Sequence, residues 1–176
     1  MRLVRRQLAH GSRGASIAPA ASIWYFAYGS NLWTEQLVAR IGPLDDAADK
    51  PRVARLANYG LVFQHLDVTS AAYADIVTPG EGVIGVIYRC TAEQLDRLDI
   101  HEGGYDRQAV TVIDEQGESL SAMVYIMTPT PSLRFGKPTN AYLRKILRGA
   151  REHHLPEAYM RQIEAIAQSG ENKSEG

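Results

Sequence analysis

Segments typical of short β-strands fill most of the chain up to residue 128, and two helical segments follow them. The strand-like segments are residues 23–27, 51–66 with a break at Asn58-Tyr59-Gly60, 73–78, 83–90, 108–113 and 121–128. Aromatic and β-branched residues dominate the first of them, as in a buried strand. After a proline-rich stretch, helical spacing resumes at about 139–153 and 156–168. This order predicts an α+β domain in which about six strands curl into a small barrel, followed by two C-terminal helices.

Two shorter helical segments lie among the strands. Residues 32–41 carry apolar side chains at helical spacing directly after a polar turn, and Ser30, Asn31 or Thr34 is expected to cap that helix. Thr91-Ala92-Glu93-Gln94 is a capping box, which predicts the start of a second short helix. Residues 23–41 are therefore expected to form a strand, a tight loop and the beginning of a helix in immediate succession.

Composition excludes several classes of protein. A chain of 176 residues has the usual size of one domain. Its net charge of −1 argues against general nucleic-acid binding, which relies on clustered cations. Because no apolar run approaches the roughly 18 residues of a membrane-spanning helix, we expect no membrane partner. The single cysteine, Cys90, cannot form an internal disulfide and fits a reducing cytoplasm, where we expect the protein to act.

The two ends of the chain differ in composition from its middle. The first 34 residues contain four basic side chains and no acidic one, and the first twenty lack the apolar block of a secretory signal. We expect residues 1–20 to be a disordered basic leader, residues 21–168 to form a single domain, and residues 169–176 to be a disordered tail.

Gly80-Glu81-Gly82-Val83-Ile84-Gly85 matches the glycine spacing of dinucleotide-binding loops. In those loops the glycines follow a strand and open a helix whose N-terminus meets a pyrophosphate. Here they lead into a strand-like segment, and Glu81 would bring a negative charge to the phosphates. We therefore expect these glycines to serve the fold rather than a nucleotide.

Three carboxylates, Asp96, Asp99 and Glu102, recur at every third position. They are consistent with a solvated acidic helix face or, if the helix continues, with a divalent-cation site. A third interpretation uses Glu102 alone. Because two glycines follow it, Glu102 is expected in a tight loop just after the helix. The negative helix end, together with burial, would raise the pKa of its carboxyl group and suit it to proton transfer near neutral pH.

The loop Tyr28-Gly29-Ser30-Asn31 also allows two interpretations. Gly29 permits a sharp turn, and free backbone N–H groups at the start of the next helix can hold a carboxylate or an oxyanion. The alternative is an ordinary polar helix cap, because such residues are common at any helix start. Loop chemistry alone leaves the two interpretations open.

Three segments in the same order resemble the γ-glutamylcyclotransferase family, which is related to the AIG2-like proteins. The first is Phe26-Ala27-Tyr28-Gly29-Ser30-Asn31-Leu32. The second contains Gly85-Val86-Ile87-Tyr88 and Leu95-Asp96-x-Leu98-Asp99-x-x-Glu102-Gly103. The third comprises Tyr125-Ile126-Met127, Tyr142, Gly149-Ala150 and Leu155-Pro156. The resemblance spans about residues 23–168 and points to the branch that acts on γ-glutamyl amino acids.

The resemblance implies a small curled barrel flanked by helices, with neither a metal nor an organic cofactor. It assigns Glu102 as the catalytic acid and base. His101, the neighbouring residue, is a rival base by its residue type and not by the resemblance. It assigns these residues to substrate binding: Tyr28, Gly29, Ser30, Asn31, Leu32, Tyr105, Tyr125 and Tyr142. The linker Gly103-Gly104 is shorter than the family pattern, which bears on the placing of Tyr105.

The activity that the resemblance implies is the release of 5-oxoproline from a small γ-glutamyl substrate by attack of its own α-amine on its γ-carbonyl. The rival functions are removal of a γ-glutamyl group from an amine in a specific pathway, a non-catalytic module that binds γ-glutamyl ligands, and a hydrolase with a metal on Asp96, Asp99 and Glu102. We expect a small-molecule partner and no nucleic acid, and we allow for a homodimer.

Overall fold

Five strands close into a barrel in the order β1-β5-β2-β6-β7. The strands are β1 (Ser22–Ala27), β2 (Arg52–Leu56), β5 (Val83–Thr91), β6 (Tyr105–Asp114) and β7 (Ser119–Met127). Neighbours are antiparallel except for β1 and β7, which run parallel and complete the closure. The computed structural model describes residues 21–45, 49–66 and 71–170, so the expectations for residues 1–20 and 171–176 lie outside the described residues.

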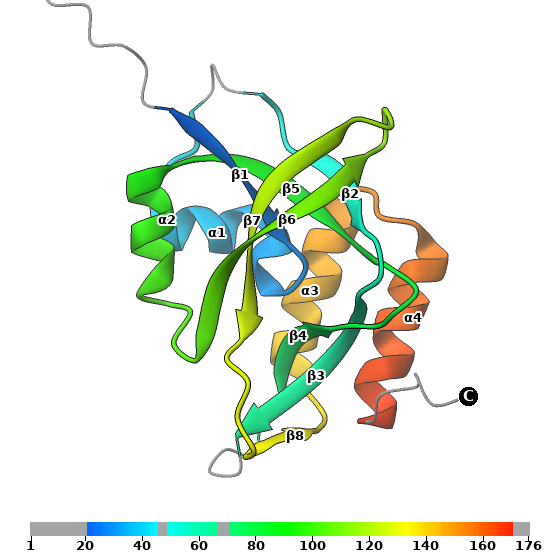
Figure 1. Ribbon diagram of the computed structural model, residues 1–176. Coiled ribbons are helices and arrows are strands. Elements are labelled where there is room, and N and C mark those ends of the chain that lie inside the picture. Colours follow the sequence, from blue (N-terminus) through cyan, green and yellow to red (C-terminus); the bar gives the residue numbers. More distant parts are fainter. Residues whose placement is uncertain (1–20, 46–48, 67–70, 171–176) are drawn as a thin grey trace, which may run out of the picture.

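A second sheet of three strands has the order β4-β3-β8 and extends from one end of the barrel (Figure 1). It contains β3 (Gly60–Leu66), β4 (Tyr73–Val77) and β8 (Leu133–Phe135). The predicted break at Asn58-Tyr59-Gly60 is confirmed, because a turn in which Asn58 has a φ of +63° separates β2 from β3, and the two strands lie in different sheets. The α+β fold with a curled sheet is confirmed, but the barrel has five strands rather than about six, and β8 was not predicted.

Four α-helices and one 3-10 turn complete the described part of the chain. They are η1 (Ser30–Leu32), α1 (Thr34–Ile41), α2 (Ala92–Asp99), α3 (Asn140–Glu152) and α4 (Glu157–Ser169). Helix α1 packs against α2, α3 packs against η1 and α4, and α4 also contacts β3 (Figure 1). The two predicted C-terminal helices are thus confirmed, with α4 ending one residue beyond its predicted boundary. No helix in the described ranges has the length and apolar character to cross a membrane.

The two short helices begin in different ways. Thr91 caps α2, and Gln94 completes the predicted capping box with a return hydrogen bond. The expected cap of α1 is wrong, because Trp33 occupies the N-cap position and no side chain caps the helix. Ser30 and Asn31 lie one turn earlier, in η1, and are buried. The side chains of Ser30 and Asn31 therefore do not cap a helix.

The glycine pattern at residues 80–85 has a packing explanation. A Cβ atom on Gly80 would lie 2.1 Å from the Gly60 nitrogen, and one on Gly85 would lie 2.3 Å from the Ala27 carbonyl oxygen. Gly82 has a φ of +116°, which favours glycine. Gly85 lies within β5, and no helix follows the pattern directly. Gly80 and Gly85 therefore allow backbones to approach closely.

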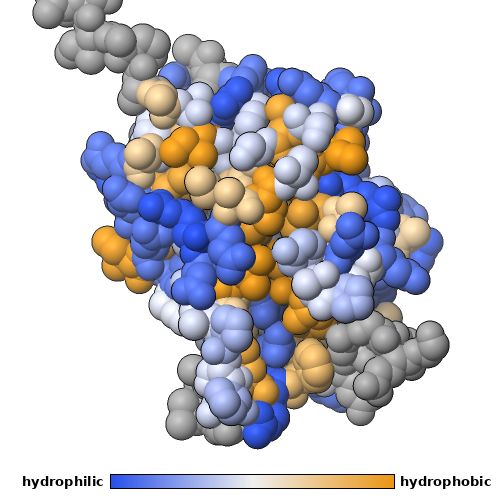
Figure 2. All heavy atoms as spheres, in the orientation of Figure 1, coloured by the Kyte–Doolittle hydropathy of each residue, from blue (hydrophilic) through white to orange (hydrophobic). Residues whose placement is uncertain are grey.

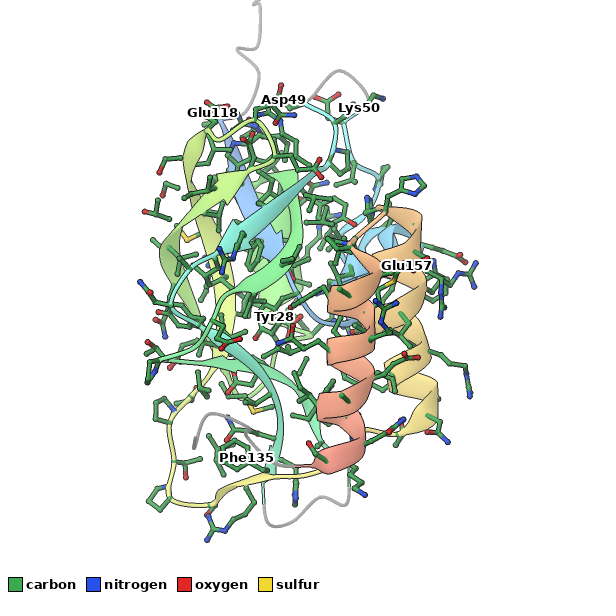
Figure 3. All side chains as sticks on the ribbon, turned by 90° about the vertical axis from the view of Figure 1, so that its right-hand side faces the viewer. Tyr28, Asp49, Lys50, Glu118, Phe135 and Glu157 are labelled. Atoms are coloured by element: carbon green, nitrogen blue, oxygen red, sulfur yellow. The ribbon has the colours of Figure 1, made fainter. Side chains whose placement is uncertain are left out.

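The exterior is uneven in hydropathy. Figure 2 shows hydrophilic side chains gathered over α2 and an apolar band that crosses the barrel strands. Asp49 and Glu118 lie at the barrel end that is remote from the small sheet, and Phe135 lies at the other extreme of the molecule (Figure 3). Tyr28 lies between these extremes, inside the molecule and only 6% exposed. The residues around Tyr28 form the candidate site.

Candidate active site

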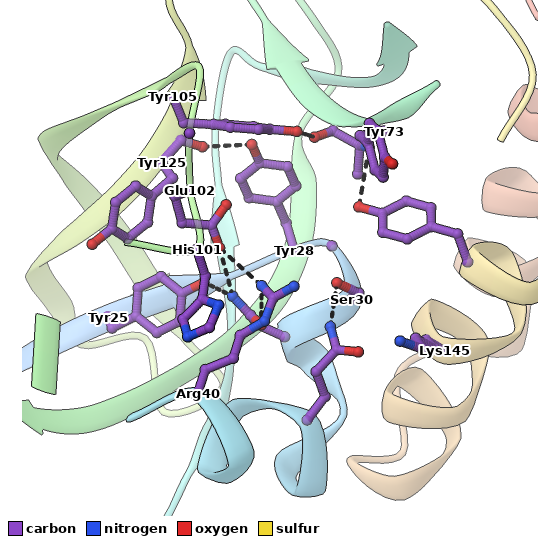
Figure 4. A pocket seen from close by; sticks show the side chains of 16 residues that line it. Tyr25, Tyr28, Ser30, Arg40, Tyr73, His101, Glu102, Tyr105, Tyr125 and Lys145 are labelled. Atoms are coloured by element: carbon purple, nitrogen blue, oxygen red, sulfur yellow. Dashed lines mark hydrogen bonds and ion pairs between the residues drawn. The ribbon is translucent and has the colours of Figure 1, made fainter. Parts of the chain in front are cut away.

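A cavity of about 450 Å³ opens where β1, η1 and the loop after α2 meet β4 and α3 (Figure 4). Its walls bring together residues from segments that are far apart along the chain. They are Tyr25, Tyr28, Gly29, Ser30, Asn31, Gln36, Arg40, Tyr73, Ala74, His101, Glu102, Gly103, Tyr105, Tyr125, Tyr142 and Lys145. The buried Glu102 carboxyl group lies in the wall of this cavity.

Glu102 is held in a tight turn after α2. Its backbone nitrogen donates to the Asp99 carbonyl at 3.2 Å, and its own carbonyl accepts from the Tyr105 nitrogen at 3.0 Å. The side chain is only 13% exposed. Oε1 accepts hydrogen bonds from Asn31 Nδ2 at 3.0 Å and from an Arg40 nitrogen at 3.2 Å. Oε2 accepts none from the described residues, so it is available to a ligand in the cavity.

The environment raises the pKa of the Glu102 carboxyl group. Burial is the main cause, and the nearby charge of Asp99 adds to it. Arg40 and the hydrogen bond from Asn31 lower the pKa and offset part of the effect of burial. The direction agrees with the expectation from the sequence. A carboxyl group with a raised pKa can accept and return a proton closer to neutral pH than an exposed one.

The turn η1 supplies polar groups to the cavity wall beside Glu102. Asn31 donates to the Tyr25 hydroxyl at 2.9 Å and accepts from Arg40 at 3.1 Å, while the Ser30 hydroxyl accepts from Gln36 at 2.6 Å. Both side chains therefore build the cavity rather than cap a helix. Because the first N–H groups of a helical turn have no acceptor within it, this wall also offers backbone donors.

Gly29 begins this turn in a crowded place. A Cβ atom there would lie 3.3 Å from both the Ala74 side chain and the Tyr142 hydroxyl. Helix α3 presses on the other end of η1 at Gly149, where a Cβ atom would lie 2.2 Å from the Trp33 nitrogen and 2.3 Å from the Leu32 carbonyl carbon. The absence of side chains at these two glycines lets α3 and β4 fix the position of η1.

Six tyrosines form the remaining walls, and hydrogen bonds fix most of their rings. Tyr28 donates to the Tyr125 carbonyl, and Tyr105 donates to the Ala74 carbonyl at 2.8 Å. The Ala74 nitrogen in turn donates to the Tyr142 hydroxyl at 3.2 Å. Burial raises the pKa of Tyr142 to about 12, so its hydroxyl stays protonated at neutral pH. The tyrosines therefore form rigid, uncharged parts of the cavity wall, and Glu102 is the one carboxyl group among the residues that line it.

The structure brings most of the predicted site residues to this cavity. Glu102 and seven of the eight predicted binding residues line it, Tyr105 included despite the short glycine linker. Leu32 is the exception, because its side chain is fully buried in the core and does not line the cavity; its carbonyl oxygen accepts a hydrogen bond from Tyr88. His101 also lines the cavity but is exposed, whereas Glu102 is largely buried.

Sequence reasoning missed several lining residues. They are Tyr25, Gln36, Arg40, Tyr73, Ala74, Gly103 and Lys145. Tyr25 lies in an apolar strand, where an inward-facing tyrosine cannot be told from a core residue. Arg40 lies near the end of α1, a common place for a solvated cation. Its role as the ion-pair partner of Glu102 is visible only in the structure, because the packing of α1 against α2 brings the two side chains together.

The three evenly spaced carboxylates do not meet. Asp96 and Asp99 pair with Arg107 on the outer side of α2, whereas Glu102 faces the cavity. Among the described residues, no three histidine, cysteine or acidic side chains are grouped as metal ligands. The geometry thus gives no support to a cation site on Asp96, Asp99 and Glu102.

Comparisons with known proteins bear on what this cavity is. The model of the AIG2-like family matches residues 82–163, which include Glu102. The γ-glutamylcyclotransferase of Mus musculus is 32% identical over 152 residues, covering 81% of this chain and 77% of the mouse protein. The chain belongs to the γ-glutamylcyclotransferase family. The human γ-glutamylcyclotransferase is also 32% identical, over 155 residues that cover 82% of this chain and 79% of the human protein.

A solved γ-glutamyl cyclotransferase structure shares the fold, with a TM-score of 0.70 and 31% identity over 89% of this chain and 92% of the other. The resemblance seen in the sequence is therefore confirmed. This γ-glutamylcyclotransferase family member is an enzyme of that kind. The cavity around Glu102 is the candidate for its active site.

Proposed function

We propose that the enzyme converts a γ-glutamyl amino acid into 5-oxoproline and a free amino acid. The α-amine of the substrate attacks its own γ-carbonyl carbon, a five-membered lactam forms, and the bond to the leaving nitrogen breaks. The observation that carries the proposal is the placement of the Glu102 carboxyl group: it is buried, held through one oxygen by Asn31 and Arg40, and free through the other.

Glu102 acts on both nitrogens in turn. Its carboxylate takes a proton from the α-ammonium group, which leaves a nucleophilic amine. After the amine has added to the carbonyl carbon, the same carboxyl group gives that proton to the leaving nitrogen, and the C–N bond breaks. It then carries a second proton from the former α-nitrogen to the released amine, so the lactam keeps one N–H and the amino acid leaves as an ammonium group. No water is consumed, and atoms and charges balance. The raised pKa of Glu102 suits both transfers, and acid–base catalysis of this type contributes about 10²- to 10⁴-fold.

The walls of the cavity supply orientation. The backbone donors of η1 take the α-carboxylate of the glutamyl group, and the fixed tyrosine rings hold its carbon chain in a folded conformation. Since the reaction is intramolecular, the correct folded conformer is the main requirement. Orientation of this kind is worth roughly 7–11 kcal/mol of the barrier.

Product analysis tests the proposal. The enzyme is incubated with γ-glutamyl-alanine, and 5-oxoproline, alanine and glutamate are quantified by chromatography. We expect equal amounts of 5-oxoproline and alanine and no enzyme-dependent glutamate, because the amine rather than water attacks the carbonyl. Release of glutamate in place of 5-oxoproline would mean hydrolysis, and the absence of any product would favour a binding module.

A further inference from the structure

Lys145 is a cation at the mouth of the cavity that the proposed reaction does not use. It comes from α3, lines the cavity and is exposed to solvent. Figure 4 shows it across the cavity from Glu102, beyond Ser30, with its amino group directed toward the cavity. The amino group forms no ion pair with a described residue, in contrast to the paired Arg40.

The formal charges of the lining residues favour an anionic ligand. Glu102 and Arg40 form an ion pair and cancel, so Lys145 leaves the cavity with one positive charge in excess when histidine is taken as neutral. A γ-glutamyl amino acid carries two carboxylates and one ammonium group, a net charge of −1. A γ-glutamyl amine lacks the second carboxylate and has no net charge. The cavity is thus complementary to the first kind of substrate.

The depth of each group decides which carboxylate Lys145 meets. Glu102 lies in the buried part of the cavity, and the reacting nitrogens have to reach it there. The glutamyl group must therefore enter first, with its own carboxylate at the buried turn η1. The leaving group then extends toward the mouth, where Lys145 is exposed.

We propose that Lys145 is a specificity-determining residue that binds the carboxylate of the leaving amino acid. The inference rests on the proposed function and names the residue that recognises its leaving group: through Lys145, substrates with a carboxylate next to the released nitrogen are preferred over simple amines and over lysine side chains in isopeptides. Because Lys145 is exposed, its ion pair with the substrate has the modest strength of a surface pair.

Kinetics with a matched pair of substrates measure this preference. Wild-type enzyme is expected to have a kcat/KM for γ-glutamyl-alanine about fivefold higher than for γ-glutamyl-alaninamide, mainly through KM. Lys145→Met should remove the preference by slowing only the first substrate, and Lys145→Arg should retain it. Arg144→Met, which removes the same charge from the neighbouring position outside this cavity, should leave the preference intact.

An equal decrease in kcat/KM for both substrates in Lys145→Met would overturn the inference, because Lys145 would then bind the glutamyl carboxylate that both substrates share. An equal loss of preference in Arg144→Met would also overturn it, because a general field rather than a specific contact would be responsible.

A binding measurement separates this inference from the proposed reaction. N-glutaryl-alanine lacks the α-amine and cannot cyclise, so its affinity can be compared with that of N-glutaryl-alaninamide by calorimetry. We expect wild-type protein to bind the carboxylate form about fivefold more tightly, and Lys145→Met to bind the two alike. This result would stand even if no 5-oxoproline were formed from γ-glutamyl-alanine. Formation of 5-oxoproline without any difference in affinity would overturn the role of Lys145 alone.

Discussion

Arg40 and Glu102 form an ion pair of 3.2 Å in the wall of the cavity, and the same guanidinium nitrogen donates to Asn31 Oδ1 at 3.1 Å. Arg40 thereby opposes the effect of burial, which raises the pKa of Glu102. The pair keeps the carboxyl group ionised over a wider pH range than burial alone would allow. It also fixes Asn31, which holds the same carboxylate oxygen.

Replacing Arg40 should therefore change the pH dependence of the enzyme. In Arg40→Met the pKa of Glu102 rises further, because its opposing charge is gone. The reaction needs the ionised carboxylate, so the activity should fall at a higher pH than in the wild type as the solution is acidified. The measurement is kcat/KM for γ-glutamyl-alanine between pH 5 and 9.

Arg161→Met provides the control for this profile, because Arg161 pairs with Glu157 on the surface of α4, outside the cavity. Its profile should overlay that of the wild type. If kcat/KM of Arg40→Met falls at the same pH as in the wild type, or at a lower pH, then Glu102 is not the group whose ionisation limits the rate.

Gly149→Ala tests the contact between α3 and η1. The added Cβ atom would overlap the backbone at Leu32 and Trp33, so the helix or the turn must move. We expect a loss of about 1–3 kcal/mol in the free energy of unfolding, together with a lower kcat/KM because η1 is displaced. Urea denaturation and steady-state kinetics provide the two readouts. A stability within about 0.5 kcal/mol of the wild type and unchanged kinetics would contradict the tight contact.

Much of this architecture can be read from the sequence, because local patterns specify it. The capping box at Thr91 and the apolar spacing of the terminal helices predicted α2, α3 and α4. The division of strands between two sheets could not be predicted, because it depends on which strands pair across long separations. Strand β8 has only three residues and lies among prolines, so no pattern marks it.

The residues of the candidate site that belong to a local sequence motif could be predicted from the sequence. Glu102 and residues 28–31 lie in tight loops whose glycines are visible in the sequence. Arg40 and Lys145 were missed because both look like solvated helix residues, and only tertiary packing brings them to the cavity. Leu32 was included because it follows the loop directly, whereas its side chain is buried in the core and does not line the cavity.

His153 should make the stability of the fold sensitive to acid. Its Nε2 lies 2.7 Å from the Tyr88 hydroxyl, which donates to the Leu32 carbonyl at the end of η1. Burial lowers the pKa of His153 in the folded state, although Glu152, 3.7 Å away, opposes this. As the pH falls through the unfolded value of about 6.5, the unfolded chain binds more protons than the folded one, and stability is lost.

In His153→Gln this contribution is absent. The free energy of unfolding, measured in urea at pH 7.5 and pH 5.0, should therefore drop less in the variant than in the wild type. The same drop in both proteins would show that His153 does not couple protonation to the position of η1.

The most direct measurement of the central claim is the rate of 5-oxoproline formation by Glu102→Gln. The variant keeps the size and polarity of the side chain but cannot carry the proton. We expect it to fold, to bind γ-glutamyl-alanine within a fewfold of the wild type, and to lose about 10²- to 10⁴-fold in kcat, while His101→Gln remains active. Turnover by Glu102→Gln within about twofold of the wild type would contradict the assignment of this residue as the proton carrier.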